Sequence, residues 1–253
     1  MRAKNDIYVG IFFLLLLVIT SQINAQGSAG TAAPYESRVI VDMPTAGVLS
    51  KNTLGLQMVA FADGGILADA SFAPFTNFNI GLGYSGTKIL GTGSIISQGL
   101  PSLHLRYRVI DETLTIPAIM VGLNSQGRGV VANKRFETRA PGLFGAVSKQ
   151  YKWPGGTVSL HGGIGYSVDL GFEGAGLNVW GGVEQSLGGS AALQVEFNSV
   201  LNESKQQPLL NLALRWAIVS GVTLELQARD VFGNLPSAQG ATRTLAIEVI
   251  RRL

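Results

Sequence analysis

The sequence of 253 residues contains no cysteine, which excludes disulfides, thiolate metal sites and a lipidated cysteine. Charged residues make up only 14% of the chain, below the roughly 25% of an average soluble domain, and apolar residues make up 46%. The formal net charge of +3 is small and its lysines and arginines form no cluster, which argues against nucleic acid as a partner.

Long apolar runs are also absent, except near the N-terminus. There, Arg2 and Lys4 precede an apolar run from Ile7 to Thr20. This run of about 14 residues is shorter than the roughly 20 residues of a membrane-spanning helix, and Ala25 offers a cleavage position. We therefore predict a cleaved signal peptide at 1–25, with an uncleaved anchor helix as the alternative. The mature protein is then exported and has no transmembrane helix.

Amphipathic helical patterns are missing from the rest of the chain, and alternation of period two takes their place. In GVTLELQARD (221–230), Val, Leu, Leu and Ala alternate with Thr, Glu, Gln and Arg. This alternation indicates a β-strand with one apolar and one polar face. Similar segments follow one another, separated by Gly, Pro, Asn and Asp. We predict about twelve strands, each near the roughly 9 to 11 residues of a barrel strand: 53–61, 65–73, 77–85, 101–109, 114–124, 141–150, 156–166, 176–187, 190–199, 208–217, 222–229 and 243–252.

The predicted connections alternate between short and long. Short ones read PFTN, IDE, KWPG, GG and SG, and longer ones cover 86–100, 125–140, 167–175, 200–207 and 230–242. Outer-membrane barrels have such short periplasmic turns and longer extracellular loops, although the first hairpin, ADGG, is a short exception. We predict an all-β chain, an antiparallel up-and-down transmembrane β-barrel in the outer membrane of a Gram-negative bacterium. A flexible periplasmic lead-in at 26–52 precedes the barrel at 53–253, and a soluble exported β-sandwich binding module is the alternative.

The polar faces of these strands predict a network of charged side chains in the lumen. Two interpretations remain open: the charges fill a closed lumen with ion pairs, or they line a narrow aqueous pore. The predicted members are Arg106, Arg108, Glu184, Glu196, Arg215, Glu225, Arg229 and Glu248. Aromatic residues near strand ends are candidates for girdles at the membrane interfaces: Tyr84, Tyr151, Trp153, Tyr166 and Trp216.

Candidate catalytic residues are few. The only histidines are His104 and His161, both on predicted lumenal faces. Ser159 shares a face with His161 but lies about 7 Å along the strand, too far for a direct hydrogen bond. We therefore expect no enzyme, with a barrel hydrolase that uses a lumenal histidine as the alternative. No metal cluster is visible. The Gly-rich GLGYSGTKILGTG leaves a strand without entering a helix, so we expect neither a phosphate site nor a cofactor.

Residues 43–173 carry a resemblance to known sequences. They contain MPTAGVLSKNTLGLQMVAFADGGILADASFAPFTNFNIGLGYSGTKILGTG, PSLHLRYRVIDETLTIPAIMVGLNSQGRG and APGLFGAVSKQY. This part resembles a group of uncharacterised outer-membrane barrels similar to the YjbH-type exopolysaccharide-associated proteins. The resemblance implies a barrel with a link to surface polysaccharide, and it supplies no catalytic residues.

We therefore expect a porin-like structural or transport barrel, linked to export of a surface polysaccharide. The expected partners are outer-membrane lipid and lipopolysaccharide, the barrel-assembly machinery and a polysaccharide. The basic loop RGVVANKRFETR (128–139) would meet lipopolysaccharide phosphates or acidic polysaccharide if it faces outward, and a purely solvated loop is the alternative.

Overall fold

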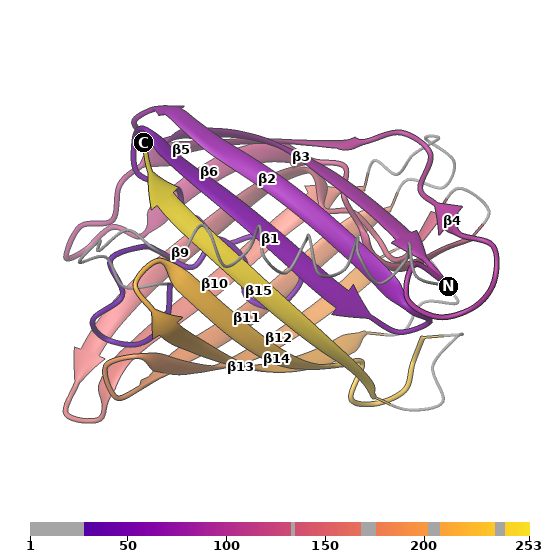
Figure 1. The fold of residues 1–253 in the computed structure, drawn as a ribbon. Coiled ribbons are helices and arrows are strands. Elements are labelled where there is room, and N and C mark those ends of the chain that lie inside the picture. The colour runs from indigo at the N-terminus through magenta and orange to yellow at the C-terminus, as the bar shows by residue number, and fades with distance from the viewer. Residues whose placement is uncertain (1–27, 133–134, 168–175, 202–207, 236–240) are drawn as a thin grey trace.

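A computed structural model describes residues 28–132, 135–167, 176–201, 208–235 and 241–253. The predicted signal peptide lies outside these described residues. The chain forms a closed barrel of twelve antiparallel strands, as predicted (Figure 1). Within the described part of the chain, no helix is long and apolar enough to cross a membrane.

The strand bounds follow the predicted ranges closely. Strand β6 is the main difference, because it begins at Ala118 and not at 114. The barrel strands are β1 (Thr53–Phe61), β2 (Gly65–Phe75), β3 (Phe78–Thr87), β5 (Ser102–Ile110), β6 (Ala118–Asn124), β9 (Gly142–Trp153), β10 (Gly156–Tyr166), β11 (Leu177–Leu187), β12 (Ala191–Leu201), β13 (Leu209–Val219), β14 (Val222–Arg229) and β15 (Thr242–Arg252). Three further strands lie in long connections and were not predicted: β4 (Ile96–Ser97), β7 (Arg128–Ala132) and β8 (Arg135–Thr138).

Each barrel strand pairs with its neighbours in chain order, and β1 closes the ring by pairing with β15. The pairing of β1 with β15 runs from Thr53 opposite Arg252 to Ala60 opposite Leu245. A closed barrel has no open edge, so its backbone N–H and C=O groups are paired without water. The turns at the end where β1 begins and β15 ends are short, and the long connections lie at the other end together with the short β1–β2 turn.

The apolar faces of the strands point outward and the polar faces point inward. In β14, the side chain of Leu226 is 53% exposed, whereas neighbouring Glu225 is 4% exposed. A soluble sandwich would have the opposite arrangement, so that alternative is wrong. The five candidate girdle aromatics are all exposed. Tyr84 and Tyr166 lie toward the long-loop end of their strands, and Tyr151, Trp153 and Trp216 lie toward the short-turn end. This outer surface is suited to lipid between two aromatic bands.

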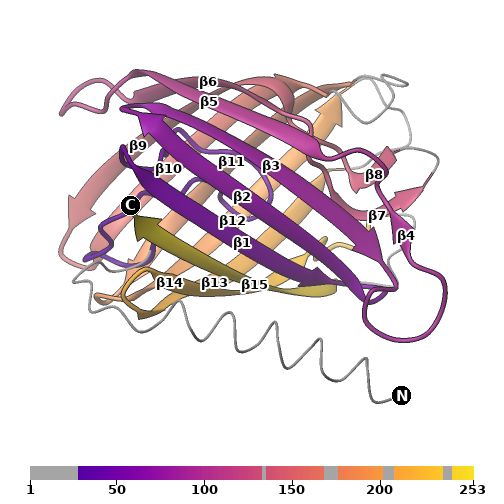
Figure 2. The ribbon, with the colours of Figure 1, turned by 45° about the horizontal axis from the view of Figure 1, so that its top comes forward.

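The segment predicted as a flexible lead-in differs from that expectation. Residues 28–52, which we call the N-terminal hairpin, run inside the barrel, where Figures 1 and 2 show them as the indigo segment. The hairpin turns at 40–43, where the N–H of Ile40 donates to the carbonyl of Met43 at 2.9 Å. Ile40, Val41 and Leu49 are fully or almost fully buried. The hairpin therefore fills part of the lumen.

The outward apolar face predicts how the barrel responds to a charge placed on it. Leu82 lies in the middle of β3 with 56% of its side chain exposed. We expect Leu82→Arg to destabilise the barrel in lipid vesicles, lowering its free energy of unfolding by about 2–4 kcal/mol, because the guanidinium must sit in hydrocarbon. Denaturant titration of vesicle-inserted protein measures this change. The control is Leu114→Arg, since Leu114 is 99% exposed in a turn and its replacement should change little.

Candidate functional site

The base of the N-terminal hairpin is fixed at the short-turn end of the barrel. The N–H of Ser28 donates to Thr223 Oγ1 at 3.2 Å, and the N–H of Thr31 donates to the carbonyl of Gly188 at 3.3 Å. At the far end of the segment, the N–H of Asn52 donates to the carbonyl of Ala73 at 2.7 Å. The hairpin thus rises into the lumen and returns to the end where β1 begins.

The tip of the hairpin is held by one carboxylate. The backbone N–H groups of Val41, Asp42 and Met43 all donate to Glu196 Oε2, at 2.9, 2.8 and 2.8 Å. The second oxygen, Oε1, accepts a hydrogen bond from Asn211 Nδ2 at 2.9 Å. Successive N–H groups that converge on one anion form a nest, and hydrogen bonds to a charged acceptor are stronger than neutral ones. Glu196 is fully buried, so it is a main anchor of the hairpin.

The side chain of Asp42 joins the tip to the long-loop end of the barrel. Its Oδ2 accepts hydrogen bonds from Arg229 Nε at 2.8 Å and from Asn211 Nδ2 at 3.3 Å. Arg128 Nε, on strand β7, lies 3.7 Å from Oδ1. Arg229 Nη2 also donates to Thr138 Oγ1 on β8, at 3.1 Å. The β7–β8 loop and the hairpin tip therefore meet inside the lumen.

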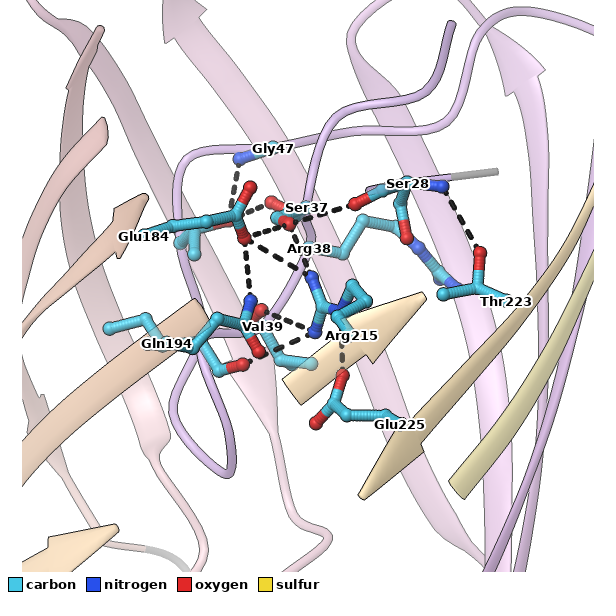
Figure 3. A network of polar contacts seen from close by, with 12 residues as sticks. Ser28, Ser37, Arg38, Val39, Gly47, Glu184, Gln194, Arg215, Thr223 and Glu225 are labelled. Carbon is cyan, nitrogen blue, oxygen red and sulfur yellow. Dashed lines mark hydrogen bonds and ion pairs between the residues drawn. The ribbon is translucent and has the colours of Figure 1, made fainter. Parts of the chain in front are cut away.

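Arg215 links the middle of the hairpin to the wall (Figure 3). Its Nε donates to Glu225 Oε2 at 2.6 Å, across the β13–β14 pair in which the two residues are opposite each other. Its Nη2 donates to the carbonyls of Val39 and Ile40, each at 3.2 Å. Ser37 contacts both Arg215 Nη1 and Glu184, the latter at 2.6 Å. One guanidinium thus binds two wall carboxylates and the hairpin backbone.

The remaining members of the predicted charge network also lie against the hairpin. Glu248 forms an ion pair with Arg38 of the hairpin, and Arg108 forms one with Glu36. Arg106 Nη1 donates to the carbonyls of Arg38 and Gly47 at 2.7 and 3.2 Å.

The network therefore includes one cross-strand pair, Arg215 with Glu225, and otherwise joins the wall to the hairpin. Glu225 reaches the hairpin through Arg215, and the other predicted members contact it directly. The hairpin's own charged residues, Glu36, Arg38 and Asp42, were not predicted as members of the network. The signal that could have indicated them is three charges within seven residues of the predicted flexible lead-in.

The tip of the hairpin packs against the wall mainly through apolar side chains. Ile40 and Met43 join a buried cluster with Met120 on β6, Phe144 on β9 and Trp180 on β11. Trp180 Nε1 donates to the carbonyl of Pro44 at 2.9 Å, which satisfies the one polar group of that ring. The tip of the hairpin therefore has an apolar contact with β6, β9 and β11, whereas nearer its base the hairpin leaves a polar recess beside β9 and β10, which Ser148, Lys149 and His161 help to line.

The two histidines do not form a hydrolase triad. His161 Nδ1 lies 2.8 Å from Ser148 Oγ, and not near Ser159, but no carboxylate among the described residues bonds its other nitrogen. His104 Nε2 lies 2.7 Å from Asp69 Oδ2, and Ser71 donates to the same carboxylate at 3.0 Å. A catalytic triad needs the histidine between the serine and the carboxylate, whereas in this group the carboxylate of Asp69 lies between His104 and Ser71. In the described parts of the chain, no group of three or more metal-ligating side chains occurs.

The basic loop at 128–139, for which contact with lipopolysaccharide or a purely solvated state was predicted, turns Arg128 into the lumen instead. It forms the β7–β8 hairpin, which carries Arg128 to the tip carboxylate of Asp42. Arg139 is buried as well. Lys134 lies outside the described residues. Ion pairing in the lumen draws Arg128 away from the surface, so this arginine does not belong to an outward-facing basic patch.

Solved porins share this fold. Two structures of the KdgM porin, one in complex with disordered oligogalacturonate, match with TM-scores of 0.51 and 0.52. Each match covers 78% of this chain and 98% of the porin at 8% sequence identity. The NanC porin matches with a TM-score of 0.43 at 7% identity, over 79% of this chain and 99% of the porin. No family model matches the sequence, and no curated protein matches it. The chain is therefore a porin-like β-barrel of the outer-membrane type.

The anchoring role of Glu196 leads to a labelling prediction. The sequence has no cysteine, so Met43→Cys places a single thiol at the tip, where the native side chain is 2% exposed. We expect Glu196→Ala to raise the rate of maleimide labelling at position 43 by about tenfold or more, because three N–H groups lose a charged acceptor. Leu114→Cys, exposed in a turn, is the control and should label quickly with or without Glu196. Equal labelling at position 43 in both backgrounds would contradict this role.

Proposed function

We propose that this protein is an outer-membrane channel that its own N-terminal hairpin closes in the resting state. The observation that carries this proposal is the hairpin in the lumen, anchored by Glu196, Arg215, Arg229 and Glu248. All these contacts are noncovalent. The hairpin is joined to the barrel wall by the chain at the start of β1, at the short-turn end. It can therefore leave toward that end without any strand separating.

The chemistry of the contacts favours a removable plug over a permanent filling. Replacing a buried ion pair by apolar residues of similar volume is often neutral or stabilising. The many charges therefore add little stability to a lumen that stays permanently filled. A polar wall is useful when the same surface must accept water after the hairpin moves. Carboxylates and guanidiniums of both signs then line an aqueous passage and set its selectivity.

The proposed cargo is a segment of surface polysaccharide. The resemblance of residues 43–173 to barrels linked with exopolysaccharide supports this choice, as does a lumen rich in amide and hydroxyl groups, such as Asn79, Gln194 and Asn211. Such groups exchange hydrogen bonds with sugar hydroxyls as readily as with water. Conduction is favoured over hydrolysis because neither histidine has both a serine and a carboxylate in the order that catalysis requires. Outer-membrane lipid and lipopolysaccharide are the proposed surroundings of the apolar outer face.

Planar-bilayer recordings of refolded residues 26–253 test the proposal. We expect the wild-type channel to stay mostly closed and Glu196→Ala to raise the open fraction by about tenfold or more, because the tip loses a charged anchor.

A disulfide lock provides the matched control. The N–H of Ala46 donates to Ser148 Oγ at 2.9 Å, so these two positions are in contact, and Ala46→Cys with Ser148→Cys is the pair chosen for a disulfide. In the Glu196→Ala background, the oxidised lock should abolish the current and a reductant should restore it. Hairpin gating would be refuted if folded Glu196→Ala protein carried no current, or if its current were the same with the disulfide oxidised and reduced. Heat-modifiable gel mobility verifies that each variant is folded.

A further inference from the structure

A small recess lies between the hairpin and the wall formed by β1, β2, β3 and β5. Arg106, on β5, is one of the residues that line it, and its cavity volume is ≈ 40 Å³. One buried water needs about 10–15 Å³, so the recess has room for about three waters, or for one small ion with a water, and for no organic ring. Charge and hydrogen-bond donors therefore decide what the recess binds.

Arg106 is a buried positive charge without an acidic partner. The residue is 6% exposed, and its Nη1 donates to the carbonyls of Arg38 and Gly47, on the two arms of the hairpin. Within the described parts of the chain, no carboxylate lies at ion-pair distance from this guanidinium. A buried charge that lacks a counter-ion is destabilising. The fold therefore maintains a positive site that an anion would stabilise.

The other ionisable side chains along the recess each lie against a partner of their own. The contacts are Arg38 with Glu248, His104 with Asp69, Arg128 with Asp42, and Arg215 with Glu225. Among the described residues of the lining, Arg106 is the one ionisable side chain that has no such partner. The two carboxylates of the lining, Asp69 and Glu248, are thus already engaged and compete little for this arginine.

Hydrogen-bond donors are also left over in the recess. The Nε and Nη2 atoms of Arg106 donate to no described residue, yet they are not among the fully buried atoms, so they face open space. Asn124, on β6, lines the same recess, and its Oδ1 accepts from the N–H of Gln126 at 2.9 Å. Its amide Nδ2 has no acceptor among the described residues. Donors without acceptors favour a ligand that only accepts hydrogen bonds, and an anion accepts the strongest ones.

We propose that the recess binds a chloride ion, with Arg106 as its counter-charge and Asn124 as a neutral donor. Chloride is monovalent, accepts hydrogen bonds from any direction and is small enough for the cavity. Because the same guanidinium binds the carbonyls of both hairpin arms, the ion holds Arg106 in the position that clamps the hairpin. The inference deepens the proposed function, since it rests on the same hairpin and names what regulates its closure.

Maleimide labelling of Met43→Cys tests this requirement. The chain (26–253) is refolded in sodium chloride, sodium bromide or sodium isethionate at equal ionic strength, which keeps charge screening constant. Isethionate, an organic sulfonate, is too large for the cavity. We expect labelling to be about tenfold faster in isethionate than in chloride or bromide, and chloride added to isethionate to suppress it with saturation, because one site is filled.

Two variants show whether the effect acts through Arg106. Arg106→Gln removes the charge and should label at the same rate in all three salts. Arg251→Gln is the matched control, because Arg251 is exposed at the end of β15, and this variant should keep the salt dependence of the wild type. The ratio between salts is the quantity compared, so a hairpin that Arg106→Gln loosens in every salt does not obscure the result.

The anomalous X-ray signal of bromide in crystals of the folded barrel locates the ion. A peak beside Arg106 that is lost in Arg106→Gln supports the proposal. The proposal is overturned if no peak lies there, or if wild-type labelling is equal in the three salts, in which case a peak marks an adventitious ion only. Labelling needs no current. A hairpin that responds to chloride in a barrel that never conducts would refute the channel and retain this site. A hairpin-gated channel that labels equally in every salt would do the opposite.

Discussion

The pairing of β1 with β15 is the constraint on which the rest of the structure depends. A strand in lipid has no water to satisfy its backbone, so the sheet must close on itself. Closing twelve strands fixes a lumen that is wider than the wall's side chains fill, because small barrels of about eight strands are the ones filled by side chains alone. The N-terminal hairpin occupies the remaining space, and its polar surface matches a wall whose polar faces must point inward.

The hairpin contacts the wall in two unlike ways. Toward β6, β9 and β11 its tip packs through Ile40 and Met43 against Trp180. Toward β1, β2, β3 and β5 it leaves polar groups around Arg106. Electrostatics and packing therefore act on different faces of one short segment. The apolar face positions the hairpin, while the hydrogen bonds and ion pairs of Glu196 and Arg215 hold it in the lumen.

The barrel could be predicted because its determinants are local. Period-two alternation, as in β14, and the alternation of turn lengths are visible within ten or twenty residues of sequence. The inward placement of residues such as Glu196 and Arg215 follows from the same alternation. Their partners could not be predicted. Backbone N–H groups at 41–43 have no sequence signature, and the contact of Asp42 with Arg229 spans most of the chain. The inward fold of Arg128 depends on that same distant carboxylate.

The ion pair between Arg38 and Glu248 joins residues that are 210 positions apart, one before the first strand and one on the last. The Ser28 hydroxyl reaches the same carboxylate at 3.2 Å. The pairing of β1 with β15 already brings these two distant segments together, so the ion pair adds little further loop-closure cost once the ring is closed. The seam of the barrel and the attachment of its plug therefore depend on the same strand, β15.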